Sequence, residues 1–227
     1  MLVLVPARAA ADAADAPPPT ARLRFSGLLG SALGVGRITP GGATLGEVMP
    51  PALLTGADVA FAPLRQLDFG VNALALLGLG EPNVCPGPSE SCSLAAGGQL
   101  ALRLRYHLWP EQTFNPWLAV GGGLDLLGTT GVTTDTRAGL LFNATTRTER
   151  RRIYWGPLGL LQVGGDYRLR RAVYVGGVLG YALGSYAHLE HSVRVDGETE
   201  SSWSGNSPTQ FHHWLYLAAQ ATFDVAL

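Results

Sequence analysis

The chain contains no lysine, so all 16 basic residues are arginine, and 17 acidic residues bring the net charge to −1. A chain without excess positive charge lacks the electrostatic footprint of a nucleic-acid binder, and we expect no such partner. Charged residues make up only 15% of the sequence, whereas soluble domains contain about 25%. This scarcity of charge favours a protein that meets an apolar environment.

A long apolar run is also missing. The nearest approach, residues 69–80, contains Asn72 and is shorter than the roughly 20 residues that a spanning helix needs. The 30 glycines recur inside apolar stretches, where they weaken helices. Only helices and closed barrels satisfy the backbone inside a membrane, so two classes remain: a soluble β protein or a β-barrel in lipid.

The sequence does contain segments in which apolar and polar residues alternate, and the longest of these segments lies at the C-terminus. Every second residue of the segment 211–227 is apolar, apart from His213, and the residues between them are mixed or polar. Alternate side chains of a strand point to opposite faces, so this segment is predicted to be one two-faced strand. Its 17 residues exceed the roughly 9–11 that cross a bilayer as a strand.

The same alternation predicts seven further strands, for a total of eight. The expected strands are residues 21–36, 55–62, 67–78, 94–108, 117–128, 152–169, 172–189 and 211–227. Long and short connections alternate between them, so all the short turns lie at the end that carries both termini. The polar segments 129–151 and 190–209, and the connection after residue 36, are predicted to be loops.

Strand number, loop asymmetry and alternation resemble the small eight-stranded outer-membrane β-barrels of bacteria, the OmpA, OmpX and OmpW type. The resemblance implies an all-β, antiparallel up-and-down transmembrane barrel with short periplasmic turns and long extracellular loops. It also implies integral insertion in the bacterial outer membrane as a monomer without a cofactor. The expected partners are membrane lipid, lipopolysaccharide and the barrel-assembly machinery. The assembly signal of that family ends in an aromatic residue, and here Leu227 takes its place.

The domain organisation follows from composition. Residues 1–20 are interpreted as an export-signal remnant with a Pro-rich leader, because a short apolar run is followed by small-x-small patterns and by Pro17–Pro19. A disordered Ala/Pro-rich tail is the alternative. Residues 21–227 are predicted to form the barrel.

Charge placement distinguishes the membrane barrel from a soluble one. If the apolar rows face lipid, the inward charges are Arg22, Arg24, Asp58, Asp68, Arg103, Arg105, Asp125, Asp166, Arg168 and Asp224. A soluble barrel with the reverse arrangement would expose continuous rows of Leu, Val and Phe to water. Interfacial aromatic girdles are expected from Trp117, Tyr167 and Phe223 at the periplasmic end and from Trp155, Tyr181 and Phe211 at the outer end.

Eight of the inward charges should meet in the periplasmic half of the lumen: Arg22, Arg24, Asp68, Arg103, Arg105, Asp166, Arg168 and Asp224. An eight-stranded barrel is just wide enough for side chains to fill it. Unpaired buried charges are costly, so we expect a paired network that plugs the lumen. Asp224 should meet Arg22 or Arg24, because the last strand pairs with the first. A narrow solute path is the alternative.

Three smaller features complete the candidate sites. Cys85 and Cys92 are the only cysteines, and export would favour a disulfide between them. Arg147, Arg150, Arg151 and Arg152 form a basic cluster suited to lipopolysaccharide phosphates, with a solvated loop as the alternative. His188 and His212 are expected to point inward together, but no ligand set completes a metal site.

The sequence thus predicts a structural or surface-interaction role with a polar, largely plugged lumen. A narrow channel or transporter for small or hydrophobic solutes is the first alternative. A lipid A-modifying enzyme is less well supported. Glu190, His191 and Ser192 are adjacent in sequence and cannot share one strand face, and no nucleophile elbow or nucleotide-binding motif is present. We therefore expect no catalytic residues.

Overall fold

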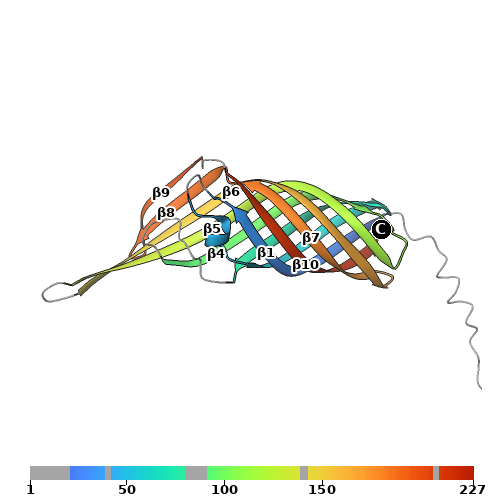
Figure 1. Ribbon diagram of the computed structural model, residues 1–227, viewed down its shortest axis with the longest axis horizontal. Helices are drawn as coiled ribbons and strands as arrows, with labels where there is room; N and C mark the ends of the chain where they lie inside the picture. The colour runs from blue at the N-terminus through green and yellow to red at the C-terminus, as the bar shows by residue number, and fades with distance from the viewer. Residues whose placement is uncertain (1–20, 39–41, 80–90, 139–142, 207–209) are drawn as a thin grey trace, which may run out of the picture.

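In a computed structural model the chain forms a closed antiparallel β-barrel of eight strands (Figure 1). The structure describes residues 21–38, 42–79, 91–138, 143–206 and 210–227, with the backbone alone at 91–94, 135–138 and 143–145. The barrel strands are β1 (Arg22–Gly36), β2 (Ala52–Leu64), β3 (Leu67–Gly78), β4 (Ser91–His107), β5 (Phe114–Ala138), β6 (Asn143–Arg170), β7 (Val173–Ser185) and β10 (Phe211–Ala226). Pairing of β5 with β6 and of β10 with β1 closes the ring.

Both ends of the barrel chain, Arg22 and Leu227, lie at one end, which we call proximal; the opposite end is distal (Figure 1). The short turns β2–β3, β4–β5 and β6–β7 also lie at the proximal end. The predicted strand count, antiparallel order and placement of short turns are confirmed. No helix among the described residues has the length and apolarity to cross a membrane.

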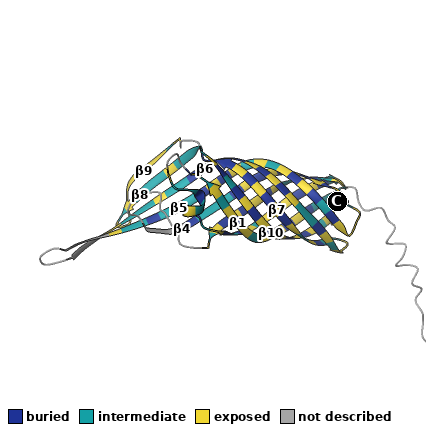
Figure 2. Ribbon diagram, in the orientation of Figure 1, coloured by how far each residue is buried: buried dark blue, intermediate teal, exposed yellow. Residues whose placement is uncertain are grey.

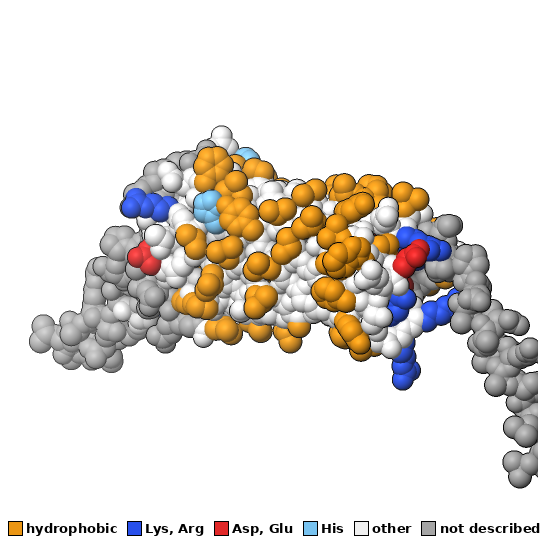
Figure 3. Space-filling view, turned by 45° about the vertical axis from the view of Figure 1, so that its right-hand side comes forward, with side chains coloured by type: hydrophobic (Ala, Val, Ile, Leu, Met, Phe, Trp, Pro, Cys, Tyr) orange, Lys and Arg blue, Asp and Glu red, His pale blue; other side chains and the backbone are white. Residues whose placement is uncertain are grey.

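The wall alternates between exposed and buried residues along each strand (Figure 2). On β10, Leu217 is 64% exposed, while its neighbour Ala218 is buried. Hydrophobic side chains cover the middle of the visible wall, and arginine and acidic side chains gather toward its ends (Figure 3). Seven of the ten charges that the sequence placed inward are buried, as Asp68 and Arg24 show at 0% and 1% exposure, whereas Arg22, Arg168 and Asp224 at the proximal rim are half-buried. An apolar exterior around a charged interior is the arrangement for a wall in contact with lipid, not with water.

Both polar segments predicted to be loops contain strands instead. The strands β5 and β6 remain paired as far as Ala138 and Asn143. Within 190–209, β8 (His188–Val195) pairs with β6, and β9 (Glu198–Asn206) pairs with β8. The result is a four-stranded outer sheet, β5-β6-β8-β9, which projects beyond the distal end (Figure 1). The two loop predictions were wrong because strands that project into water do not need an apolar row.

A helix lies in the connection that was expected to be a loop between β1 and β2. The helix α2 (Leu45–Val48) begins with a capping box, in which Thr44 and Glu47 exchange hydrogen bonds. Leu45, Val48 and the adjoining Met49 are fully buried. They join the apolar cluster of the lumen, whose members toward the distal end also include Leu54, Leu76, Leu127, Tyr154, Tyr186 and Trp214, and which reaches Trp117 in the proximal half. The lumen is therefore polar only in part.

Candidate functional site: the filled lumen and the outer sheet

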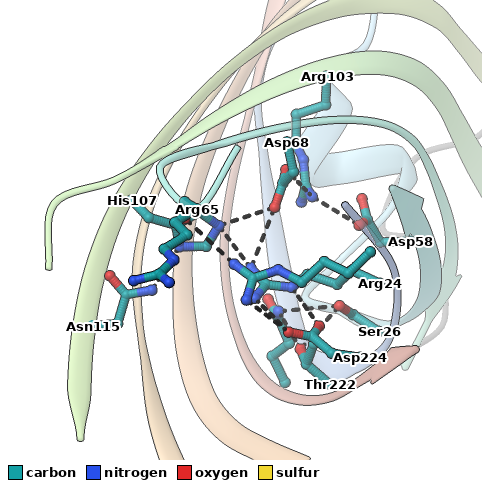
Figure 4. Close-up of polar contacts among 12 residues, drawn as sticks. Arg24, Ser26, Asp58, Arg65, Asp68, Arg103, His107, Asn115, Thr222 and Asp224 are labelled. Carbon is teal, nitrogen blue, oxygen red and sulfur yellow. Dashed lines mark hydrogen bonds and ion pairs between the residues drawn. The ribbon is translucent and has the colours of Figure 1, made fainter. Parts of the chain in front are cut away.

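Arg24 lies at the centre of the proximal lumen (Figure 4). Its Nε and Nη2 donate to the two carboxylate oxygens of Asp224, at 2.8 and 3.1 Å, in a bidentate pair. Its Nη1 donates to Asp68 Oδ2 at 3.3 Å. Arg22 lies at the proximal rim, with Nη1 3.5 Å from Asp224 Oδ2. Arg24 thus bridges β3 and β10 across the lumen, and Asp224 meets both arginines of β1.

A second arginine continues this network through the neighbouring strands. Arg103 Nη2 donates to Asp58 Oδ1 at 2.7 Å and lies 3.6 Å from Asp68 Oδ1. His107 Nε2 lies 2.9 Å from Asp68 Oδ2, and Asn115 Nδ2 lies 2.7 Å from His107 Nδ1. These residues are all buried. Because opposite charges meet at hydrogen-bonding distance, the proximal network stabilises the barrel only while its members remain paired.

Among the described residues, the other predicted charges of this region, Arg105, Asp166 and Arg168, form no ion pair between a carboxylate and an arginine. Arg105 is fully buried, and its guanidinium stacks on the Trp117 ring, 4.0 Å from the centroid. Asp166 is buried, whereas Arg168 lies at the rim, where its Nη2 donates to the Pro110 carbonyl. Trp117, expected in the periplasmic girdle, is instead inside the lumen at 1% exposure. That prediction was wrong because residue 117 falls on the inward row of β5.

Three hydrogen-bonding side chains, those of Asp125, His212 and Trp214, meet within the apolar distal half. Asp125 Oδ2 accepts a hydrogen bond from Trp214 Nε1 at 2.9 Å and lies 2.7 Å from His212 Nε2. The Tyr186 ring stacks on His212 at a centroid distance of 4.0 Å. Sequence reasoning assigned Asp125 and His212 to the lumen but did not pair them, because β5 and β10 are not neighbours in the barrel.

His188 does not accompany His212. It pairs with Trp155 in the β6–β8 ladder, and the two rings stack at 4.1 Å on the outward face. The expectation that both histidines point inward was wrong, since β8 joins the outer sheet and not the barrel wall. No group of three His, Cys, Asp or Glu side chains suited to a metal occurs in the part of the chain that the structure describes.

The four arginines of the basic cluster lie on opposite faces of β6. Arg147 and Arg151 share the outward row with Ile153 and Trp155, whereas Arg150 and Arg152 continue the inward row of Tyr154. Arg151 is exposed and lies opposite Ser192 on β8, which lies opposite Ser202 on β9. This cross-strand row lines a surface hollow of about 470 Å³, together with Ile153, Glu190, His191, Trp203 and Ser204.

The hollow lies over the paired strands β6, β8 and β9 of the outer sheet. Ile153 and Arg151 follow Trp155 on the outward row of β6, so the hollow lies immediately distal to the Trp155–His188 stack. Glu190 and Ser192 face into this side, while His191 pairs across the opposite row with Arg152 and accepts from Trp203 Nε1 at 3.0 Å. The Glu190–His191–Ser192 sequence therefore does not bring its three side chains to one face.

The structure does not test the prediction of a disulfide or the prediction of a leader segment. Cys85 and residues 1–20 are not among the described residues, and only the backbone of Cys92 is described. Both stay predictions. Cys92 lies at the start of β4, where its partner on β5 is Gly131.

Comparison with known proteins identifies the fold only. No protein-family model matches the sequence, and no curated protein matches it. A major outer membrane protein from Thermus thermophilus has a similar crystal structure, with a TM-score of 0.56 and 15% identity over 90% of this chain and 99% of that one. OprG from Pseudomonas aeruginosa has a TM-score of 0.45 and 11% identity over 92% and 98% of the chains, too distant to carry an argument. The chain has the fold of a small outer-membrane β-barrel.

Proposed function

We propose that this protein is an integral outer-membrane barrel that is closed to solutes and acts through the sheet it presents outside the membrane. The observation that carries the proposal is the bridge made by Arg24 across the proximal lumen to Asp68 and Asp224. The 1% exposure of Arg24 supports a lumen that is filled at this level. In the distal half, the buried side chains of α2 close the lumen a second time.

The length of the strands supports the external role. With 25 and 28 residues, β5 and β6 are far longer than the roughly 9–11 residues that cross a bilayer. The excess continues as the outer sheet, whose last strand, β9, is exposed along almost its whole length. A protein that served only to fill the membrane would not need this projection.

Lipopolysaccharide is the proposed partner of the outward row. Arg147 and Arg151 are exposed on the face that continues the apolar outer wall, and the proposal sets the phosphates of the outer leaflet at their level. Arginine binds phosphate oxygens through paired N–H donors, and the hydroxyl groups of Ser192 and Ser202 lie in the same cross-strand row as Arg151. The proposed role is non-catalytic.

Conductance across planar bilayers tests the closed barrel. The purified protein should produce no steady channels, and proteoliposomes containing it should not swell in small sugars. Steady conductance steps from the folded barrel would contradict the proposal and favour a solute path.

Lipopolysaccharide co-purification tests the partner separately. The double variant R147E/R151E should reduce the lipopolysaccharide retained by the folded barrel, because it reverses two charges on the outward row. The matched control R150E/R152E reverses two charges of the same strand on the opposite face. Equal retention in both double variants would rule out a contact specific to the outward row.

A further inference from the structure

Short side chains form the floor of the hollow on the outward face of the outer sheet. Ser192 lies opposite Arg151 on β6 and opposite Ser202 on β9. In the next row, Glu190 lies opposite Ser204. Because serine side chains are short, the face of the sheet dips here and leaves a hollow of about 470 Å³. This volume falls within the range of about 300–1,000 Å³ that small-molecule sites occupy.

One guanidinium and one carboxylate line this hollow. Arg151 and Glu190 are both exposed and belong to the outward rows of β6 and β8. Their cross-strand partners are Ser192 and Ile153, so the two charges occupy diagonal positions on one face, about 7–8 Å apart at the backbone. Among the described residues, no ion pair or side-chain hydrogen bond involves either of them. Both charges are therefore available to a ligand.

A ligand with a phosphate as its only charged group fits this hollow poorly. A phosphate that accepts hydrogen bonds from Arg151 lies in the same hollow as the carboxylate of Glu190, and like charges brought together at a binding site are unfavourable. A ligand with an ammonium as its only charge meets the same penalty from Arg151. The hollow is therefore complementary to a group that carries one negative and one positive charge a short distance apart.

The hydroxyl groups of the hollow indicate which kind of cation it accepts. A primary ammonium has three N–H donors, and the carboxylate of Glu190 and the hydroxyls of Ser192 and Ser204 can accept from them. A quaternary ammonium has no such donor and is recognised by aromatic faces. Trp203 also borders the hollow, but it belongs to the opposite row, where its Nε1 donates to His191. The described residues on the outward side of the hollow therefore include no aromatic ring.

We propose that this hollow binds a phosphoethanolamine group, in which two carbon atoms join a phosphodiester to a primary ammonium. Arg151 binds the phosphate oxygens through its paired N–H donors, and Glu190 and Ser204 accept hydrogen bonds from the ammonium. The site rests on the proposed function, because it names the substituent of lipopolysaccharide that the outward row selects. Phosphatidylethanolamine carries the same group and is the second source of this chemistry.

Saturation-transfer NMR on the folded barrel, in a maltoside detergent without phosphate or amine groups, tests the site with soluble probes. Glycerophosphoethanolamine should bind about fivefold more tightly than glycerophosphocholine or glycerol phosphate, because it alone presents both a phosphate and an ammonium that donates. In E190Q this preference should disappear, and in R151Q the binding of all three probes should weaken. E198Q removes an exposed carboxylate from the opposite face of the same sheet and should keep the wild-type preference.

Equal binding of glycerophosphoethanolamine and glycerol phosphate by the wild type would overturn the proposal, as would a preference that survives in E190Q. Loss of binding on addition of EDTA would also overturn it, because a divalent cation would then bridge Glu190 and the phosphate.

The source is identified by retention of lipopolysaccharide with and without phosphoethanolamine substituents, and of phosphatidylethanolamine in nanodiscs. Stronger retention of the substituted lipopolysaccharide is expected. Equal retention of the two lipopolysaccharides would contradict this site but leave the proposed partner intact. Binding of glycerophosphoethanolamine without retention of either lipopolysaccharide would support the site and contradict the partner.

Discussion

The two halves of the lumen are filled by opposite chemistry. The proximal half contains buried arginines and aspartates joined by ion pairs, with Arg24 as the bridge. The distal half contains an apolar cluster that includes side chains of α2 and Trp214. The same eight strands line both halves, so the difference lies in the side chains of the inward rows and in α2, which packs into the distal half.

This difference shows how one barrel can be closed in two ways. In the proximal half, the pairs hold specific strands together, since Arg24 links β1 to β3 and β10. Removing one partner of such a pair destabilises the fold, because the other charge stays buried without a counter-charge. In the distal half, closure depends on volume, and a smaller side chain leaves a cavity instead of an unpaired charge.

The largest expected effect comes from breaking the proximal bridge. In R24M, Asp68 loses one ion-pair partner and Asp224 keeps only Arg22, so the free energy of unfolding should fall by about 3–5 kcal/mol. Urea unfolding in micelles, followed by tryptophan fluorescence, measures the loss. R65M removes an arginine of an exposed pair and should cost less than about 1 kcal/mol. Similar small losses in the two variants would show that the proximal charges do not hold the barrel together.

The distal half should respond to a change of volume. Leu45 is fully buried on α2, and L45A should lower the free energy of unfolding by about 2–5 kcal/mol, because the packed cluster cannot collapse around the missing methyl groups. L45M conserves the volume and should cost less than about 1.5 kcal/mol. The same urea measurement applies. An L45A protein as stable as L45M would mean that α2 does not contribute to the distal packing.

Alternation in the sequence was sufficient to predict the wall and much of the proximal network. The inward rows placed Arg24 and Asp224 in the lumen, and the pairing of the last strand with the first, which a closed barrel requires, brought them together. The pairs between more distant strands were not predictable, because Asp125 meets His212 only through the width of the barrel. Trp117 was misplaced because its residue type was given more weight than its position on the inward row.

The outer sheet was missed for a different physical reason. Strands in water can be polar on both faces, so β8 and β9 lack the apolar row that marks a membrane strand. A local signal was nevertheless present. Asp196 and Gly197 both have positive φ, at 50° and 91°, and Asp-Gly is a preferred pair for a two-residue hairpin turn. The sequence Thr44 to Glu47 is likewise the pattern of a capping box, which marks the start of α2.

The smallest expected effect concerns this cap, which helps to position the apolar side chains of α2 in the distal lumen. T44A should lower the free energy of unfolding by about 0.5–2 kcal/mol through the loss of the N-cap. The hydrogen bonds from the backbone N–H and hydroxyl of Thr44 hold the pKa of Glu47 below its usual value. A lowered carboxyl pKa contributes stability above the usual pKa and loses it as the pH falls through the lowered value.

The difference between wild type and T44A should therefore shrink on acidification, and comparing urea midpoints at about pH 6 and about pH 3 measures it. E47Q is the matched control, because its amide can still accept from Thr44 but carries no charge. The difference in midpoint between E47Q and the double variant T44A/E47Q should not depend on this titration, because neither protein carries the Glu47 carboxyl group. A wild-type advantage that is the same at both pH values would show that the charge of Glu47 does not strengthen the cap, and that α2 is held in the distal lumen by packing alone.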